Sequence, residues 1–248
     1  MAERGVDGIV YAFRDLTIER RLEEVRNDFV ATISHELRTP MAAVYGAAAT
    51  LLRSDIELSP EQGRQLLEVI ATQAARLTQI TEEVLLTSQL DRGELRVGRE
   101  PVDLVALVQS TVDAMRAHLP ESSTLAVEVP ESVGQASGDA DRIQQVLVNL
   151  LDNAVKYGGG GAVTVRVEKV NSSVRVSVAD SGPGIEPTDQ QRIFEKFYRV
   201  DAQHMRVPGG TGLGLYISRE LARRMDGRLD VRSAPGNGAT FVFELPRA

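Results

Sequence analysis

The chain has 248 residues, 42% of them hydrophobic, which is enough for packed cores in one or two domains. Its formal net charge of −7 argues against a nucleic-acid-binding protein, because such a protein would present a basic face. The absence of cysteine excludes a disulfide framework and is consistent with a reducing compartment. With only three histidines besides, a metal cage is not expected.

Nothing in the sequence indicates a membrane segment. No apolar run approaches the roughly 18 residues that a membrane-spanning helix needs, and the start at Met1 lacks the pattern of a signal peptide. We therefore expect a soluble, cytoplasmic chain. Near the N-terminus, Gly8 to Thr17 has strand-like apolar residues, but one strand cannot fold by itself. This segment is either the end of a truncated domain or a short N-terminal arm.

Two helical segments follow, from Ile18 to about Arg53 and from Glu61 to about Gln89. Each carries an apolar stripe at spacings near three and four, and Pro40 is expected to bend the first helix. Residues 54–60 form the turn between them, and residues 91–98 form a hinge after the second helix. Such a hairpin buries both faces only by pairing with a second copy, so a homodimer is expected.

The first helix carries a candidate nucleophile. His35 and Thr39 are four residues apart and share a helix face, and Glu36 adjoins the histidine. A carboxylate there can hold a neutral imidazole in one tautomer and take up its proton as the other nitrogen attacks an electrophile. The alternative is an exposed histidine with a charged neighbour. The zinc motif His-Glu-x-x-His is excluded, because Thr39 stands where the second histidine belongs.

A helix with Asp139 as its N-cap carries a second constellation. Asn149 and Asn153 are four residues apart, and Lys156 and Tyr157 follow on the same side, away from the apolar stripe. Amide oxygens suit Mg²⁺, which prefers hard oxygen ligands completed by substrate phosphates. The alternative is a solvated helix face with two incidental amides.

Two glycine-rich segments complete the pattern. The first follows a strand of alternating valines and reads Asp180-Ser-Gly182-Pro-Gly184, where a carboxylate and close backbone approach suit the exocyclic amine of adenine. The second runs from Gly209 to Leu215 and is expected to open a helix that continues to Met225, exposing N–H groups to phosphate. It matches neither a P-loop nor a dinucleotide fingerprint.

Taken in order, these motifs resemble those of the bacterial sensor histidine kinases of two-component systems. The similarity extends over roughly residues 22–246. The matching segments are an H box (Phe29 to Pro40), an N box (Gln145 to Tyr157), a first glycine box (Asp180 to Gly184), an F box (Phe194 to Arg199) and a second glycine box (Gly209 to Leu215).

The resemblance implies a multi-domain α and α+β chain. A helical hairpin forming a dimeric four-helix bundle is followed by a two-layer α/β sandwich of the gyrase, heat-shock chaperone and histidine kinase ATPase type. The expected parts are a remnant of a PAS-like sensor domain or N-terminal arm (1–17), a signalling helix and phosphotransfer hairpin through which the chain dimerises (18–90), a hinge (91–100) and an ATP-binding domain (101–248). Because many relatives are membrane receptors, the chain can be a portion of a larger receptor.

Within the second domain, the patterns predict helices and a mostly antiparallel sheet in mixed order. Residues 185–208 are expected to be an ATP lid, anchored by Phe194 and Phe197. The predicted elements are a helix at 103–119, a strand at 124–129, the asparagine helix, a hairpin of 163–170 and 174–180, the glycine-box helix, and strands at 228–233 and 239–245.

The resemblance also implies roles for individual residues. His35 is the phosphoacceptor, Glu36 orients it, and Thr39 orients the water that dephosphorylates a response regulator. Mg²⁺ is held by Asn153 with Asn149 beside it. The residues expected around ATP are Asn149, Asn153, Lys156, Tyr157, Asp180, Gly182, Gly184, Ile185, Phe197, Arg199, Gly210, Thr211, Gly212, Leu213, Gly214, Leu215 and Thr240.

The expected activity is therefore autophosphorylation of His35 from ATP, followed by transfer to an aspartate on a response regulator. Two other classes stay open. An ATPase with this pocket would need an acid at position 149, which is an amide here. A non-catalytic dimeric scaffold would be expected to lack nucleotide or acceptor residues. His118 and His204 have no comparable neighbours and are expected to be solvated.

Overall fold

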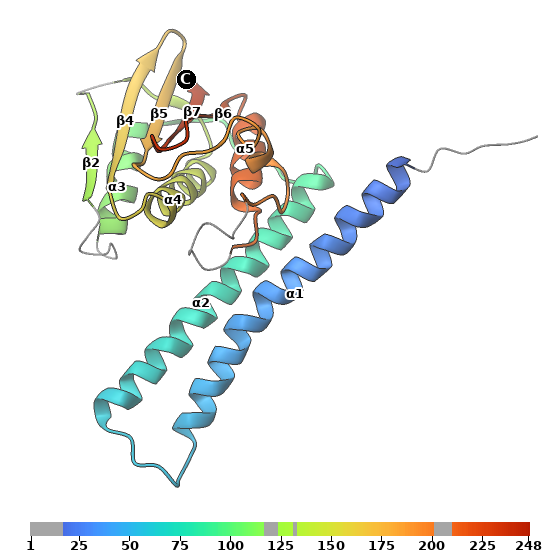
Figure 1. The fold of residues 1–248 in the computed structure, drawn as a ribbon. Helices are drawn as coiled ribbons and strands as arrows, with labels where there is room; N and C mark the ends of the chain where they lie inside the picture. Colours follow the sequence, from blue (N-terminus) through green and yellow to red (C-terminus); the bar gives the residue numbers. More distant parts are fainter. Residues whose placement is uncertain (1–16, 117–123, 131–132, 201–209) are drawn as a thin grey trace, which may run out of the picture.

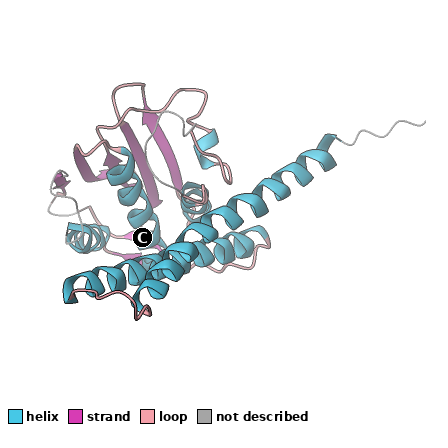
Figure 2. Cartoon of the chain, turned by 60° about the horizontal axis from the view of Figure 1, so that its bottom comes forward, coloured by secondary structure: helices cyan, strands magenta, loops and turns pink. Residues whose placement is uncertain are grey.

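The computed structural model describes residues 17–116, 124–130, 133–200 and 210–248, with side chains from residue 30 onward (Figure 1). A long helical hairpin is followed by an α/β domain that lies against the second helix near the hairpin's open end (Figure 1). Figure 2 shows the same two parts by secondary structure, the long helices on one side and the strands on the other. Of the expected N-terminal strand, only Thr17 is described, and it begins the first helix.

The hairpin consists of helices α1 (Thr17–Leu51) and α2 (Pro60–Asp91). Pro40 is buried and lies inside α1, which continues through it. Helix α2 begins with a capping box, in which Ser59 Oγ accepts from the N–H of Gln62 (3.2 Å) and Gln62 Oε1 accepts from the N–H of Ser59 (2.9 Å). This reciprocal pair fixes where the turn ends.

The α/β domain is a two-layer sandwich. Its five-stranded sheet has the order β2-β4-β5-β7-β6, with β2 and β4 parallel and the other neighbours antiparallel. A separate two-stranded sheet pairs β1 with β3. The elements are β1 (Glu100–Val102), α3 (Leu104–Arg116), β2 (Thr124–Glu128), β3 (Ala136–Gly138), α4 (Ala140–Tyr157), β4 (Ala162–Val170), β5 (Ser173–Ala179), the 3₁₀ turn η1 (Arg192–Phe194), α5 (Gly214–Arg224), β6 (Arg228–Ser233) and β7 (Ala239–Pro246).

Helices α3, α4 and α5 pack on one face of the sheet. Alternation along β5 places Val174, Val176 and Val178 in this core, opposite the apolar side of α4. The other face is charged, and the buried carboxylate of Glu244 there accepts from Arg175 (2.5 Å) and Arg228 (2.8 Å). The sheet is therefore a platform whose helical side carries the residues discussed below.

The predicted helical hairpin and two-layer α/β sandwich are confirmed. The pairing of two hairpins into a four-helix bundle concerns a second chain and stays a prediction. Three short elements, β1, β3 and η1, were not predicted, because three residues are too few to show a period. No helix in the described parts of the chain combines the length and apolar character needed to cross a membrane.

The helix predicted to open at the second glycine box begins later than expected. Residues 210–213 form a loop, and α5 starts at Gly214. Gly212 has a φ of +69°, and a Cβ there would lie 2.8 Å from the backbone of Phe197. The loop thus adopts a left-handed conformation that only glycine accommodates easily, which delays the helix.

We predict that Ser59→Ala lowers the free energy of unfolding by about 1 kcal/mol, because it removes the side-chain acceptor of the capping box. Urea unfolding followed by circular dichroism measures the change. Ser54→Ala is the matched control, since Ser54 lies in the same turn and makes no hydrogen bond within the described structure. Equal effects of the two substitutions would contradict a specific capping contribution.

Candidate active site

A cavity of about 560 Å³ lies between the α/β domain and helix α2. Most of the residues expected from the sequence face it. Those that line the cavity are Glu36, Asn149, Asn153, Lys156, Tyr157, Asp180, Gly184, Ile185, Arg199, Gly210, Thr211, Gly212, Gly214 and Leu215. Those that do not are His35, Thr39, Gly182, Phe197, Leu213 and Thr240.

Asp180 lies at the end of β5 with its carboxylate held by the backbone. Its Oδ1 accepts from the N–H groups of Gly182 (2.8 Å) and Ala239 (3.2 Å). Its Oδ2 has no hydrogen-bond partner among the described residues. A Cβ on Gly182 would lie 2.4 Å from the carbonyl oxygen of Tyr157, so glycine is needed for this approach to α4. One carboxylate oxygen is therefore fixed while the other can accept from a ligand.

The two asparagines of α4 differ in their surroundings. Asn149 Nδ2 donates to Ser218 Oγ on α5 (2.8 Å), and a Cβ on Gly214 would lie 2.3 Å from Asn149 Oδ1. This bond orients the amide, leaving its oxygen toward the start of α5. Asn153, one turn later, lines the cavity, and its side-chain amide has no hydrogen-bond partner in the described regions. Lys156 forms an ion pair with Asp152, one turn before it.

The loop before α5 is held from both sides. Thr211 is buried, and its hydroxyl accepts from the N–H of Leu213 (3.2 Å) while donating to Glu83 on α2 (2.5 Å). The N–H of Phe197 donates to the carbonyl of Gly212 (2.9 Å). Leu213 is fully buried in the hydrophobic core. Phe197 and Leu213 therefore act on the cavity through packing and the loop backbone.

Thr240 lies on β7 between two residues that do line the cavity, Ala239 and Phe241. Successive side chains in a strand point to opposite faces, so Thr240 points away from the cavity. The sequence pattern located this strand correctly, but not the face of each residue. Strand alternation around Phe241, a large apolar residue, could have supplied the missing signal.

One wall of the cavity was not anticipated. It is formed by α2, where Thr72, Arg76, Gln79 and Glu83 follow at spacings of four, three and four residues and share one helix face. Gln79 Nε2 donates to Glu83 (3.1 Å), and burial raises the pKa of the Glu83 carboxyl. A polar stripe at this spacing is visible in the sequence, but only domain docking shows what it contacts.

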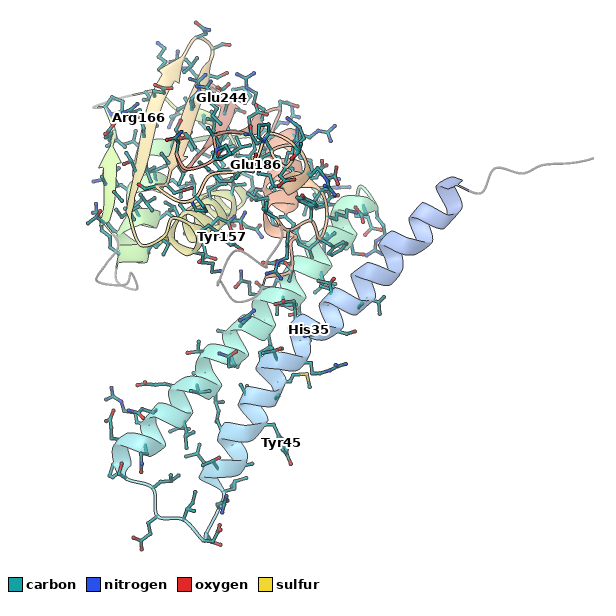
Figure 3. All side chains as sticks on the ribbon, in the orientation of Figure 1. His35, Tyr45, Tyr157, Arg166, Glu186 and Glu244 are labelled. Carbon is teal, nitrogen blue, oxygen red and sulfur yellow. The ribbon has the colours of Figure 1, made fainter. Side chains whose placement is uncertain are left out.

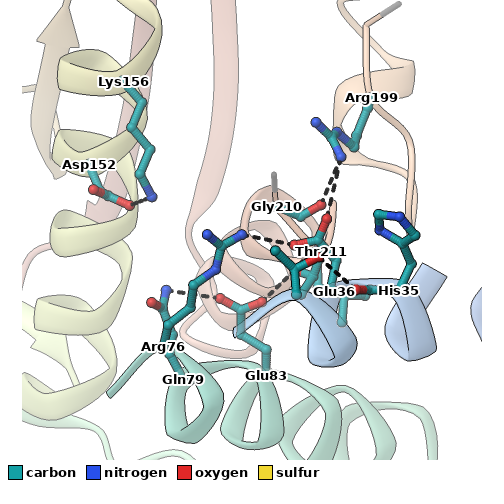
Figure 4. A network of polar contacts seen from close by, with 12 residues as sticks. His35, Glu36, Arg76, Gln79, Glu83, Asp152, Lys156, Arg199, Gly210 and Thr211 are labelled. Atoms are coloured by element: carbon teal, nitrogen blue, oxygen red, sulfur yellow. Dashed lines mark hydrogen bonds and ion pairs between the residues drawn. The ribbon is translucent and has the colours of Figure 1, made fainter. Parts of the chain in front are cut away.

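Around the candidate nucleophile, Glu36 is buried (7% exposed) and His35 is exposed. The carboxylate of Glu36 pairs with Arg76 on α2 (3.0 Å) and lies 3.8 Å from Arg199, as Figure 4 shows. Thr39 Oγ1 lies 3.5 Å from the carbonyl oxygen of His35, which is the local backbone contact of a helical threonine. Glu36 thus faces the cavity, while His35 lies beside it on the same turn of α1.

A second set of contacts fixes the domain to the end of α2. Lys196 contacts both oxygens of Asp91 (2.6 Å each), and the Tyr216 hydroxyl donates to Asp91 (3.1 Å). Burial and the nearby Asp91 carboxylate raise the pKa of Tyr216. Arg224 donates to the carbonyls of Leu90 at the end of α2 (2.8 Å) and of Leu95 beyond it (2.9 Å).

Comparisons with known proteins agree with this geometry. Residues 25–93 match the His Kinase A (phospho-acceptor) domain, and residues 138–248 match the histidine kinase-, DNA gyrase B- and HSP90-like ATPase domain. The sensor protein SrrB of Staphylococcus aureus (strain N315) is 33% identical over 247 residues, which is 98% of this chain and 42% of SrrB. The chain thus spans less than half the length of this curated relative.

Solved structures of histidine kinases are also similar to this chain. Full-length ShkA in complex with AMPPNP has a TM-score of 0.66 and 33% identity, covering 88% of this chain and 45% of ShkA. The catalytic domain of histidine kinase ThkA has a TM-score of 0.53 and 27% identity, covering 62% of this chain and 99% of that domain. Since a phospho-acceptor domain is followed here by an ATPase domain of this type, the chain belongs to the sensor histidine kinases of two-component systems.

Proposed function

We propose that this chain is an ATP-dependent protein histidine kinase that autophosphorylates His35 and passes the phosphoryl group to an aspartate of a response regulator. The observation that carries the proposal is that one cavity is lined both by Asn153 and Asp180 and by Glu36, the neighbour of His35. The residues expected to bind the nucleotide and the helix that carries the nucleophile therefore border the same cavity. The name of SrrB as a sensor protein supports this role.

The residues of the cavity fit ATP. The free oxygen of Asp180 suits the exocyclic amine of adenine, and the cleft between α4 and the glycine loop suits the phosphates. The N–H groups at the start of α5 and the positive end of its dipole face that cleft. Lys156 adds a cation there once it leaves Asp152.

The donor set also fits Mg²⁺. No group of three or more acidic, histidine or cysteine side chains that could hold a metal occurs among the described residues. Two amide oxygens, from Asn149 and Asn153, are suited to a cation that takes its other ligands from phosphates and water. When bound, Mg²⁺ would neutralise phosphate charge, and these two residues would hold it.

The chain's own residues then supply positioning and proton transfer. His35 attacks the γ-phosphorus in line, and Glu36, freed from Arg76, orients the imidazole and takes up its proton. Arg199 joins the lid to this site, since it lies 3.8 Å from Glu36 and donates to the Gly210 carbonyl (3.3 Å). Catalysis of this kind depends mainly on position and charge neutralisation.

The proposal extends to organisation and partners. Residues 18–90 form the dimerising phosphotransfer hairpin, 91–100 the hinge and 101–248 the ATP-binding domain, with 1–17 as an arm or sensor remnant. Exposed apolar residues on the hairpin, such as Tyr45 at 78% exposure, point away from it and suit a second copy (Figure 3). The second partner is the receiver domain of a response regulator, which the chain also dephosphorylates.

We predict that His35→Gln abolishes covalent labelling from radiolabelled ATP and leaves nucleotide affinity close to that of the parent, because His35 does not line the cavity. The label is assayed for stability to base and lability to acid, and affinity is measured by calorimetry. Acid-labile label that persists in the variant would sink the assignment of His35. Release of free phosphate without any protein label would instead favour an ATPase.

Asn153→Ala is expected to weaken MgATP binding about tenfold or more, because it removes a metal ligand, and to leave binding of metal-free ATP nearly unchanged. Calorimetry with and without Mg²⁺ measures both. Gln144→Ala on the exposed side of α4 is the matched control. Unchanged MgATP affinity in Asn153→Ala would remove this residue from the metal site.

Thr39→Ala is expected to keep autophosphorylation within about twofold and to lower dephosphorylation of the regulator about tenfold or more, because the hydroxyl orients the attacking water. Both rates are followed with phosphorylated regulator and labelled ATP. Thr50→Ala is the control for a purely local role, since Thr50 makes the same contact with the carbonyl four residues earlier (2.8 Å). A parallel loss of both activities in Thr39→Ala would favour the local structural role.

A further inference from the structure

We propose that the ATP site of each chain phosphorylates His35 of its own chain within the dimer, and not the histidine of the partner chain. This inference rests on the proposed kinase function and names the substrate of the same site. It is supported by the residues of the hairpin that line the cavity of the same chain. Sequence patterns leave the choice open, because both helices of the hairpin are present in each partner.

The first support is the wall that α2 contributes. Arg76, Gln79 and Glu83 all face the cavity of the chain to which they belong. Glu83 is partly buried there and hydrogen-bonded to Thr211 of the glycine loop (2.5 Å). Since a carboxylate that loses contact with water needs hydrogen-bond donors in its place, this docking is a specific contact.

The second support is the position of α1. Glu36 lines the cavity and lies 3.8 Å from Arg199 in the lid of the same chain, while Arg199 also contacts Gly210 in the glycine loop. His35 directly precedes Glu36, and consecutive Cα atoms are about 3.8 Å apart, so the backbone of His35 lies close to the edge of the cavity. Figure 4 shows His35 and Glu36 beside each other on α1. Adjacent side chains of an α-helix point about 100° apart, so a rotation of α1 by about 100° about its axis turns His35 to the direction that Glu36 now faces.

The third support is the hinge. The segment between α2 and β1 is held to the domain by Arg224, which donates to Leu90 and Leu95, and the end of α2 is held by the contact of Asp91 with Lys196. These bonds keep the domain above the α2 helix of its own chain. They also hold the cavity beside α1 of the same chain, whose Glu36 lines it.

The proposed transfer of the γ-phosphoryl group to His35 accounts for every bond and proton. A nitrogen of the His35 imidazole forms a bond to the γ-phosphorus, while the bond from that phosphorus to the bridging oxygen breaks and its electron pair leaves with ADP. The proton on the other imidazole nitrogen passes to Glu36. The proposal adds that the ATP site supplying the phosphoryl group belongs to the chain that carries His35 and Glu36.

Mixed dimers of differently tagged chains test the proposal. In the first, one chain carries His35→Gln and the other carries Asn153→Ala, so each chain retains only one half of the reaction. Transfer within a chain gives no more label than the His35→Gln homodimer. In the second, one chain is unaltered and the other carries both substitutions, and transfer within a chain gives about half the label of the unaltered dimer.

The two mixed dimers are purified through both tags, and their labelling by radiolabelled ATP is compared with that of the unaltered dimer. Transfer between chains reverses the pattern, with label in the first mixed dimer and none in the second. Label in the first mixed dimer, or absence of label from both, overturns the proposal. Failure of the kinase function itself is distinct, because the unaltered dimer would then carry no label.

Discussion

The hydrogen bond from buried Thr211 to the partly buried carboxylate of Glu83 joins the two halves of this molecule. Removing a carboxylate from water is costly unless donors replace the lost hydration, and here Thr211 and Gln79 supply them. The same hydroxyl accepts from the N–H of Leu213, which shapes the glycine loop. One hydroxyl therefore couples the position of α2 to the conformation of the glycine loop. A ligand that moves this loop would also act on the hairpin.

The charged side chains of the cavity have opposite effects on nucleotide binding: the carboxylates repel phosphates and the arginines attract them. Glu36 and Glu83 place negative groups near the expected phosphates, and like charges brought together without water raise the energy. Arg76 and Arg199 offset this, since both guanidinium groups lie at Glu36. Phosphates entering the cavity would compete with Glu36 for these arginines. In the proposed mechanism, release of Glu36 from Arg76 would make its carboxylate available to His35.

Close backbone approach explains why glycines recur around the cavity. A Cβ on Gly214 would lie 2.3 Å from Asn149 Oδ1, and one on Gly182 would lie 2.4 Å from the Tyr157 carbonyl oxygen. In both cases a side chain would push α4 away from its neighbour and widen the pocket. The glycines thus set the distances between α4, the β5 end and α5, while Asp180 and Asn149 supply the hydrogen bonds that hold them.

The sequence alone determined the helical hairpin, the asparagine helix with its Asp139 cap and the strands around the glycine boxes, because each has a local period or turn signal. It also located most residues of the cavity, since the motifs lie on those elements. Only the tertiary structure decided that Arg76 and Glu83 form a wall of the cavity and that Glu36 is bound by arginines. These features depend on contacts between residues far apart in the chain, and neither helix nor strand periodicity contains information about which distant faces meet.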